Sequence, residues 1–274
     1  MRLRIAHSTT YRYEPPASSV IQILRMTPGN HDGQYVVDWQ IDVSTDSRLD
    51  MHEDAFGNTT HVLTHGPVAD LTVSVEGLIE TQDTGGVLRG TDERFPPGFF
   101  LRSTSLTGVD PAMLGMTRAL QSGTTDDVLT FLHALMVGIN THMTFDPDPT
   151  NTGTSAADAF TLRRGVCQDY AHIFIACARA FGVPARFVSG HFLRADGVVH
   201  QQAGHAWTEA HMPDLGWVGF DPANGICTTG AHARVAIGLD YLGAAPVRGT
   251  RYGGGIESLS VAVQVDQAGR QSQS

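Results

Sequence analysis

The sequence predicts an α+β protein in which an antiparallel β-sandwich precedes a core made of a helix packed on an antiparallel sheet. Three observations predict this class. Apolar and polar residues alternate in several stretches of the first 82 residues, as is typical of half-buried strands. Apolar residues recur at helical spacing between residues 128 and 139. Beyond residue 184, short strand patterns return, separated by turns rich in glycine and proline.

The strand signals begin at the N-terminus. Residues 2–13 alternate, so that Leu3, Ile5 and His7 would share one face of a strand. The proline pair at positions 15 and 16 is expected to break this strand before it resumes at residue 20. Further strands are expected at residues 35–43, 60–63 and 71–79. Their number and spacing favour an antiparallel β-sandwich over residues 1–82.

A connection and three helices are expected next. Residues 81–107 are rich in glycine, proline, threonine and aspartate and show little periodicity, which indicates a linker partly packed on the surface. Asp110 and Pro111 are typical of the cap and first residue of a helix, and residues 125–127 are expected to cap a second one. A short third helix is expected at residues 154–160.

A cysteine stands where the chain enters its most apolar helical segment. Gly165 permits a tight approach, and the run that starts at Cys167 is apolar on most sides until Gly182. The pattern predicts a buried helix of about four turns beginning near Cys167. The helix dipole and the unpaired N–H groups at such a position favour the nucleophilic thiolate. The backbone N–H of Cys167 is also a candidate donor to an oxyanion.

A histidine and an aspartate follow on two expected strands. Residues 205–212 and 216–222 are predicted to form a hairpin, which would set His205 and Asp221 side by side. An imidazole next to a thiol can hold the ion pair and protonate a leaving group, while a carboxylate fixes its tautomer. The loop over residues 194–203, between the strands 185–192 and 205–212, is expected to border the substrate cleft.

These motifs resemble the core of the bacterial transglutaminase-like superfamily, whose members are often labelled cysteine proteases. The resemblance rests on four motifs in the same order, GVCQDYAH (165–172), GVPARFVSG (182–190), HAW (205–207) and GWVGFDP (216–222). The N-terminal motifs YRY (11–13) and DAFGN (54–58) also resemble the β-rich domain that precedes this core in such proteins.

The resemblance implies a papain-like core in which Cys167 is the nucleophile, His205 its acid/base partner and Asp221 the orienting group. Phe145 stands where relatives often carry tyrosine, which leaves the oxyanion hole without an assigned hydroxyl. The expected organisation is a β-rich domain with linker over residues 1–100, a transglutaminase-like catalytic domain over 101–265, and a polar tail over 266–274.

Each signal also has a structural interpretation. Cys167 could be an inert buried cysteine, and Asp221 could only begin a turn, but their joint occurrence with His205 favours the site. Cys177 is expected in the core, and Cys227 has no partner pattern. Thirteen histidines invite a metal hypothesis, with His205 and His211 or His191 and His200 as pairs. No spacing typical of a metal motif occurs, so neither metal nor cofactor is expected.

Three further residues are candidates for substrate or oxyanion contacts. They are Gln168, next to the nucleophile, Trp207, which could form an aromatic wall, and Phe145. His172 lies five residues beyond Cys167, about 140° around the helix, and is expected to point away from the thiol.

The composition argues against several partners and locations. A net charge of −10 and a pI near 5.6 argue against nucleic acid or an anionic membrane as partner. No apolar run approaches the roughly 18 residues that a membrane helix needs. Residues 1–8 lack the features of a signal peptide, and the three cysteines are an odd number, so a cytoplasmic location with reduced thiols is expected.

The sequence therefore predicts an enzyme that transfers acyl groups from amide or peptide bonds through a thioester on Cys167. With water as acceptor it would be a protease or amidase, which the resemblance favours. With a lysine amine as acceptor it would be a transglutaminase. A non-catalytic binding module on the same fold and an arylamine acyltransferase are weaker alternatives, because the triad is intact and no phosphate-binding glycine loop is present. The sequence predicts no oligomeric state.

Overall fold

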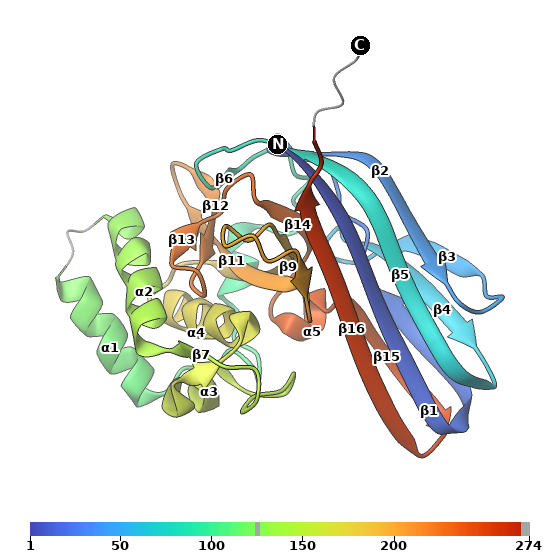
Figure 1. Ribbon diagram of the computed structural model, residues 1–274. Coiled ribbons are helices and arrows are strands. Elements are labelled where there is room, and N and C mark those ends of the chain that lie inside the picture. Colours follow the sequence, from blue (N-terminus) through green and yellow to red (C-terminus); the bar gives the residue numbers. More distant parts are fainter. Residues whose placement is uncertain (124–126, 270–274) are drawn as a thin grey trace, which may run out of the picture.

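The computed structural model describes residues 1–123 and 127–269, which form two large antiparallel sheets and a group of helices on one face of the smaller sheet (Figure 1). The larger sheet has eight strands and contains both the first and the last strand of the described chain. Its strands are β1 (Arg2–Leu24), β2 (Gln34–Val43), β3 (Leu49–Glu53), β4 (Thr59–His65), β5 (Val68–Thr81), β10 (His200–Gln201), β15 (Val247–Gly253) and β16 (Ile256–Gln267).

β1 is a 23-residue strand that serves both halves of this sheet. Its first half pairs with β5 and β16, and its second half pairs with β4 and β15. The expected break at Pro15 and Pro16 is therefore wrong. The prolines lie where the pairing with β5 shifts register, between Arg12 and Ala17, and the strand continues beyond them because the φ of proline is compatible with extended backbone.

The larger sheet folds over itself into the two layers that the sequence predicts for residues 1–82. Leu71 of β5 and Leu63 of β4 lie in one buried cluster, although their strands are not neighbours. Val73 of β5 packs with Leu49 of β3 in another cluster. Such contacts join opposite layers of a sandwich whose corner is made by bent strands.

The last strands complete this sandwich. β15 and β16 follow each other along β1, with Val247 opposite Leu24 and Gln267 opposite Leu3. Residues 247–267, which the sequence placed in the second domain and the tail, thus return to the N-terminal sheet. The local pattern of a strand does not say which sheet it joins, so this pairing leaves no mark in the sequence.

The smaller sheet holds the strands expected at residues 185–192, 205–212 and 216–222. Its strands are β6 (Val87–Leu88), β9 (Ala185–Phe192), β11 (His205–Met212), β12 (Gly216–Asp221), β13 (Ile226–Cys227) and β14 (His232–Gly238). β11 and β12 form the predicted hairpin, with Thr208 opposite Phe220. Two further short strands, β7 (Thr144–Phe145) and β8 (Arg164–Gly165), pair in parallel next to the helices that follow them in the chain, between residues 156 and 180.

The helices include all those that the sequence predicts. They are η1 (Pro97–Leu101), α1 (Pro111–Ser122), α2 (Val128–His142), α3 (Ala156–Leu162), α4 (Cys167–Ala180) and α5 (Tyr241–Ala244). The Asp110 and Asp127 side chains cap α1 and α2, while residues 125 and 126 of the predicted cap lie outside the described residues. Within the described ranges, no helix has the length and apolar character needed to cross a bilayer.

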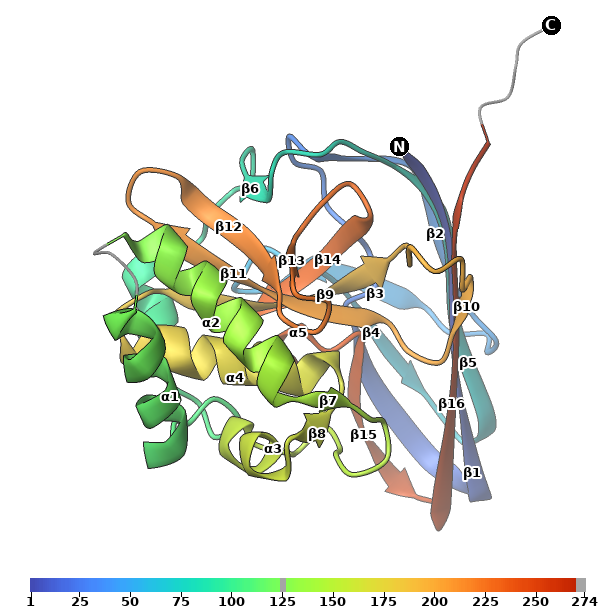
Figure 2. The same cartoon turned by 60° about the vertical axis from the view of Figure 1, so that its left-hand side comes forward.

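The core lies between α4 and the smaller sheet, with α2 beside α4 (Figure 2). Phe174 of α4 stacks on Phe220 of β12, with ring centroids 5.3 Å apart. The linker is more than a surface connection, because it supplies β6 to the sheet and its Phe100 packs on Trp217 at 5.1 Å. These contacts fix the helix that carries Cys167 over the strands that carry His205 and Asp221.

Candidate active site

Cys167 is the first residue of α4, as predicted. The N–H of Val166 donates to Oδ2 of Asp169 at 2.8 Å, and the hydroxyl of Thr150 donates to the same oxygen at 2.8 Å. These bonds fix the path of the chain into the helix. Gly165 is required here, since a Cβ at this position would lie 2.4 Å from Oδ2 of Asp169. The local sequence thus holds the thiol at the helix N-terminus.

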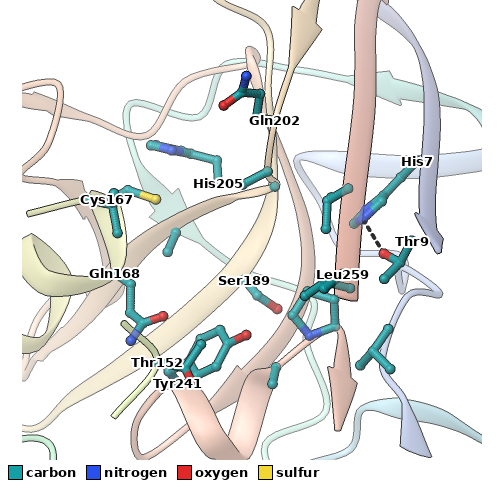
Figure 3. A pocket seen from close by; sticks show the side chains of 18 of the residues that line it. His7, Thr9, Thr152, Cys167, Gln168, Ser189, Gln202, His205, Tyr241 and Leu259 are labelled. Carbon is teal, nitrogen blue, oxygen red and sulfur yellow. Dashed lines mark hydrogen bonds between the residues drawn. The ribbon is translucent and has the colours of Figure 1, made fainter. Parts of the chain in front are cut away.

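His205 and Asp221 meet at the end of the hairpin. Nε2 of His205 lies 2.7 Å from Oδ2 of Asp221, which leaves Nδ1 as the ring nitrogen available to Cys167. Figure 3 shows Cys167 and His205 next to each other, with the sulfur directed into the pocket. Burial alone would lower the pKa of His205, but Asp221 and Cys167 outweigh it and raise that pKa to about 10. The imidazolium therefore persists at neutral pH.

Asp221 is held by two residues that sequence reasoning missed. Asn224 donates to both carboxylate oxygens, from Nδ2 at 2.7 Å and from its backbone N–H at 3.1 Å. Nε2 of His232 lies 3.2 Å from Oδ2. Because the N–H of Thr229 donates to Nδ1 of His232 at 3.1 Å, Nε2 of His232 carries the proton and donates to Asp221. Burial opposes ionisation of Asp221, but His205 and His232 hold its pKa below the usual value.

The same three side chains could in principle bind a metal. The ligand atoms of His205, Asp221 and His232 lie within 4.8 Å of one another. Two nitrogens and a carboxylate suit zinc. Both nitrogens, however, face the same oxygen of Asp221 as hydrogen-bond partners, and a metal would have to displace the bond that orients His205. The geometry fits the acid/base role better than metal ligation.

The thiol faces a cleft of about 1490 Å³ between the two sheets. One wall of this cleft contains Cys167, His205 and several residues of the loop over residues 194–203, as the sequence predicts. The opposite wall is formed by β1, β15 and β16. Figure 3 shows His7, Thr9 and Leu259 on the side of the pocket away from Cys167. The β-rich part of the chain is therefore a wall of the site.

Of the three further candidates, two line the cleft. Gln168 is 8% exposed, and its Nε2 has no hydrogen-bond partner among the described residues, so it is a candidate donor to an oxyanion. Phe145 is 59% exposed at the cleft and lies opposite Gly165 in the strand pair. Trp207, in contrast, does not line the cleft. It is 2% exposed, because it packs in a buried cluster with Trp217 and Phe100.

Tyr241 on α5 is a cleft residue without a signal in the sequence, where it reads as part of an apolar stretch. Its backbone N–H donates to Nε2 of His172 at 3.0 Å, and His172 is fully buried and does not line the cleft. Burial and the neighbouring Cys167 raise the pKa of Tyr241. The phenol thus stays protonated beside the thiol. Cys177 is fully buried, as expected.

Comparison with known proteins shows the family of both parts of the chain. The family model described as the transglutaminase-like superfamily matches residues 115–222, and the one described as the bacterial transglutaminase-like N-terminal region matches residues 3–80. An uncharacterized protein of Mycobacterium leprae is 28% identical over 96% of this chain and 98% of its own length. A protein-glutamine gamma-glutamyltransferase of Pseudomonas aeruginosa is 35% identical, over 39% of this chain and 18% of its own length.

A crystal structure from Cytophaga hutchinsonii, named a "putative cysteine protease", has the same fold. It aligns with a TM-score of 0.77 over 97% of this chain and 90% of its own, at 21% identity. The alignment covers both the sandwich and the core. The core match at residues 115–222 contains Cys167, His205 and Asp221, whereas His232 lies beyond it.

Proposed function

Because the chain belongs to the transglutaminase-like superfamily, we propose that it is a cysteine enzyme that transfers acyl groups from amide bonds through a thioester. The observation that carries this proposal is the 2.7 Å contact between His205 and Asp221, beside a thiol at the N-terminus of α4. An oriented imidazolium next to a cysteine at a helix start supports a thiolate nucleophile. The buried carboxylate supports the role of Asp221 as the orienting group.

In the proposed reaction the sulfur of Cys167 attacks the amide carbonyl carbon. The C–N bond breaks, the amine leaves with a proton from His205, and the acyl group remains as a thioester. Water or an amine then attacks the thioester and gives its proton to His205. The C–S bond breaks, which restores the thiolate and imidazolium. The backbone N–H of Cys167 and the amide of Gln168 are the donors we propose for the oxyanion.

We propose water as the main acceptor, which makes the protein a peptidase or amidase. The cleft of about 1490 Å³ leaves room for water around the thioester, and transfer to an amine requires water to be kept away. Transfer to an amine is the second candidate. It is favoured by the 35% identity with a protein-glutamine gamma-glutamyltransferase over 39% of this chain.

Alkylation of Cys167 tests the nucleophile. We would measure its rate with iodoacetamide from pH 5 to 9, by peptide mass spectrometry, in the unmodified protein and in His205→Ala. We expect a fast reaction that persists near pH 6 and is slowed at low pH by His205→Ala. Cys177 is an internal control, because burial raises its pKa to about 12. If Cys167 titrates as an ordinary thiol and is indifferent to His205, the proposal is wrong.

Product analysis then separates the two acceptors. Glutamine-containing peptides would be incubated in water enriched in oxygen-18 with a fluorescent primary amine. Hydrolysis places the heavy isotope in a new carboxyl group, whereas transfer attaches the fluorophore. We expect mainly the labelled acid. Cys167→Ala is the matched control, and equal product with this variant would show that the thiol is not the nucleophile.

A further inference from the structure

An edge of the larger sheet borders the cleft without a partner strand. β15 pairs only with β1 among the described strands. All five residues from Val247 to Arg251 line the cleft. A strand that presents one face to a cavity contributes every second residue, because its side chains alternate. An unbroken run of lining residues shows that β15 turns its backbone edge toward the cleft.

The pairing with β1 tells which backbone groups point to this edge. The N–H of Arg25 donates to the carbonyl of Pro246 at 2.7 Å. Hydrogen-bonded and non-hydrogen-bonded pairs alternate along an antiparallel ladder. Because Pro246 is in a hydrogen-bonded pair, Arg248, two residues further on, is also bonded to β1. The residues between and beyond them, Val247, Gly249 and Arg251, direct their N–H and C=O groups away from β1. Among the described residues, these outward groups of β15 have no backbone partner.

β16 continues the same edge. The N–H of Val265 donates away from β1, to the carbonyl of Val199 at 3.2 Å. By the same alternation the backbone N–H and C=O groups of Glu257, Leu259 and Val261 also point away from β1. These three alternate residues line the cleft, so β16 turns one face toward the cleft as well as bordering it with its free edge. The upper end of the edge is already covered by a strand of the chain itself, since β10 pairs with β16 at His200 and Gln201. The edge therefore accepts another strand where one is available.

The edge is held at a fixed place relative to the nucleophile. α5 lies three residues before β15, and its Tyr241 is bonded to His172 on the helix of Cys167. The hydroxyl of Ser189 donates to the carbonyl of Ala244 at 2.6 Å, which ties the same segment to β9. A strand bound along β15 would thus pass the thiol at a set distance.

The rim of the cleft is apolar at three separate points. Phe145, Val198 and Leu259 are 59%, 45% and 56% exposed, and each comes from a different segment of the chain. Exposed large apolar side chains that gather around one cleft mark a binding surface. The cleft also exceeds the roughly 300 to 1000 Å³ that is usual for small-molecule sites.

We propose that this edge binds the substrate as an extended polypeptide, which pairs with it as an additional strand. The edge consists of Val247, Gly249, Arg251, Glu257, Leu259 and Val261. The inference rests on the proposed function and adds two things to it. The substrate is a polypeptide segment, and its backbone is recognised over about five residues on each of β15 and β16, roughly 17 Å of extended chain per strand. The sandwich is the part of the chain that selects it.

Backbone methylation of a peptide tests this proposal. The probe is a fluorescein-labelled octapeptide of alternating valine and glutamine, whose binding to the Cys167→Ala variant is followed by anisotropy. We expect N-methylation of one alternate set of amides to weaken binding at least tenfold and methylation of all amides to abolish it. The same affinity for the unmethylated and fully methylated peptides would overturn the proposal, as would no binding of the unmethylated peptide at 1 mM.

A pair of variants tests the edge from the protein side. Leu259→Pro removes an outward N–H and keeps the bonds to β1, whereas Leu259→Val keeps the N–H. In the Cys167→Ala background we expect the proline to raise Kd three- to tenfold and the valine to change it less than twofold. Equal affinity of the two variants, or a dimer formed through this edge in sedimentation experiments, would overturn the proposal.

The outcome is distinguishable from failure of the proposed function. With Cys167 intact, the unmodified protein should hydrolyse a blocked glutamine amide, because a single residue does not reach the edge and its turnover needs only the proposed function. A lowered Tm in Leu259→Pro would indicate a folding defect, and the peptide methylation series then decides the question alone. Alkylation of Cys167 reports on the nucleophile in every case.

Discussion

The two walls of the cleft differ in how the sequence encodes them. The core wall carries Cys167, His205 and Asp221 on one helix and one hairpin, all between residues 167 and 221. The sandwich wall joins the two ends of the described chain, with Leu3 opposite Gln267. The comparison shows that the candidate catalytic residues lie in short local motifs. The wall that we propose to select the substrate depends instead on pairing between strands that are distant in the sequence.

The largest effect should come from Asp221→Asn in the core wall. The carboxylate accepts bonds from His205, His232 and Asn224, and an amide group would turn one acceptor into a donor facing them. We expect kcat to fall about 10⁴-fold, because the imidazole loses its tautomer and orientation. KM for a small amide should change little. If the purified, folded variant were as active as the unmodified protein, Asp221 would have no role in the reaction.

Acid should destabilise the junction between the two walls, which lowers the free energy of unfolding. His7 of β1 and His191 of β9 are buried against each other at their junction, with ring centroids 5.4 Å apart. Burial lowers the pKa of His7 to about 4 and that of His191 to about 3, from 6.5. A lowered folded pKa means that the unfolded chain takes up protons first, so stability falls as the pH falls from 6.5 towards 4. Two such groups would lower the free energy of unfolding by about 3 kcal/mol between pH 6.5 and 5.

Thermal unfolding at pH 7.5 and pH 5 measures this loss. The control is the double variant His7→Gln and His191→Gln, in which neither side chain titrates. It should be less stable than the unmodified protein at pH 7.5 and should lose less on acidification. The same pH dependence in both proteins would show that other groups govern acid stability.

His232→Gln should have a smaller effect on the core wall. His232 does not line the cleft that contains Cys167. It would therefore act on the reaction only through its hydrogen bond to Asp221. Losing one hydrogen bond to a charged group should lower kcat about 10- to 100-fold, with KM unchanged. Asparagine or glutamine at this position keeps a donor within partial reach, so His232→Phe should lose more than His232→Gln. Equal losses would indicate a packing role only.

The smallest effect is expected at the rim. Phe145→Ala removes an exposed ring beside the cleft, and we expect KM for a polypeptide substrate to rise a few-fold while kcat is preserved. Trp207→Phe is the matched aromatic change outside the cleft. It should lower the Tm and leave KM unchanged, since Trp207 is buried in a cluster behind the site. A rise in KM with Trp207→Phe would instead show that Trp207 contacts the substrate.

The core wall was predictable because each of its elements ends at a strong local signal. β9 and β11 have the bounds expected from the sequence, since Gly182, Pro184 and Pro213 interrupt the chain beside them. Gly165 and the apolar run that follows it predict the start of the helix, and Cys167 lies at that start. The hairpin then brings His205 to Asp221 without further information.

The rest depends on contacts that no short pattern records. His232 and Asn224 reach Asp221 only because of the path that the chain takes after β12. The bend of β1 at its prolines follows from pairing on both sides, and the position of β15 and β16 follows from β1 itself. Trp207 shares its strand with His205, but whether it faces a cleft or a core depends on the linker that packs over it.

The pairing of the first strand with the last has a consequence for synthesis on the ribosome. The helix of Cys167 and the hairpin of His205 and Asp221 emerge before residue 247, so their neighbours in sequence are present to pack with them. β1 must wait for β15 and β16 before its second side is paired. A nascent chain therefore holds all three reactive side chains before the sandwich wall exists. The finished polypeptide is the first form of the molecule in which a reactive thiol and its selecting wall occur together.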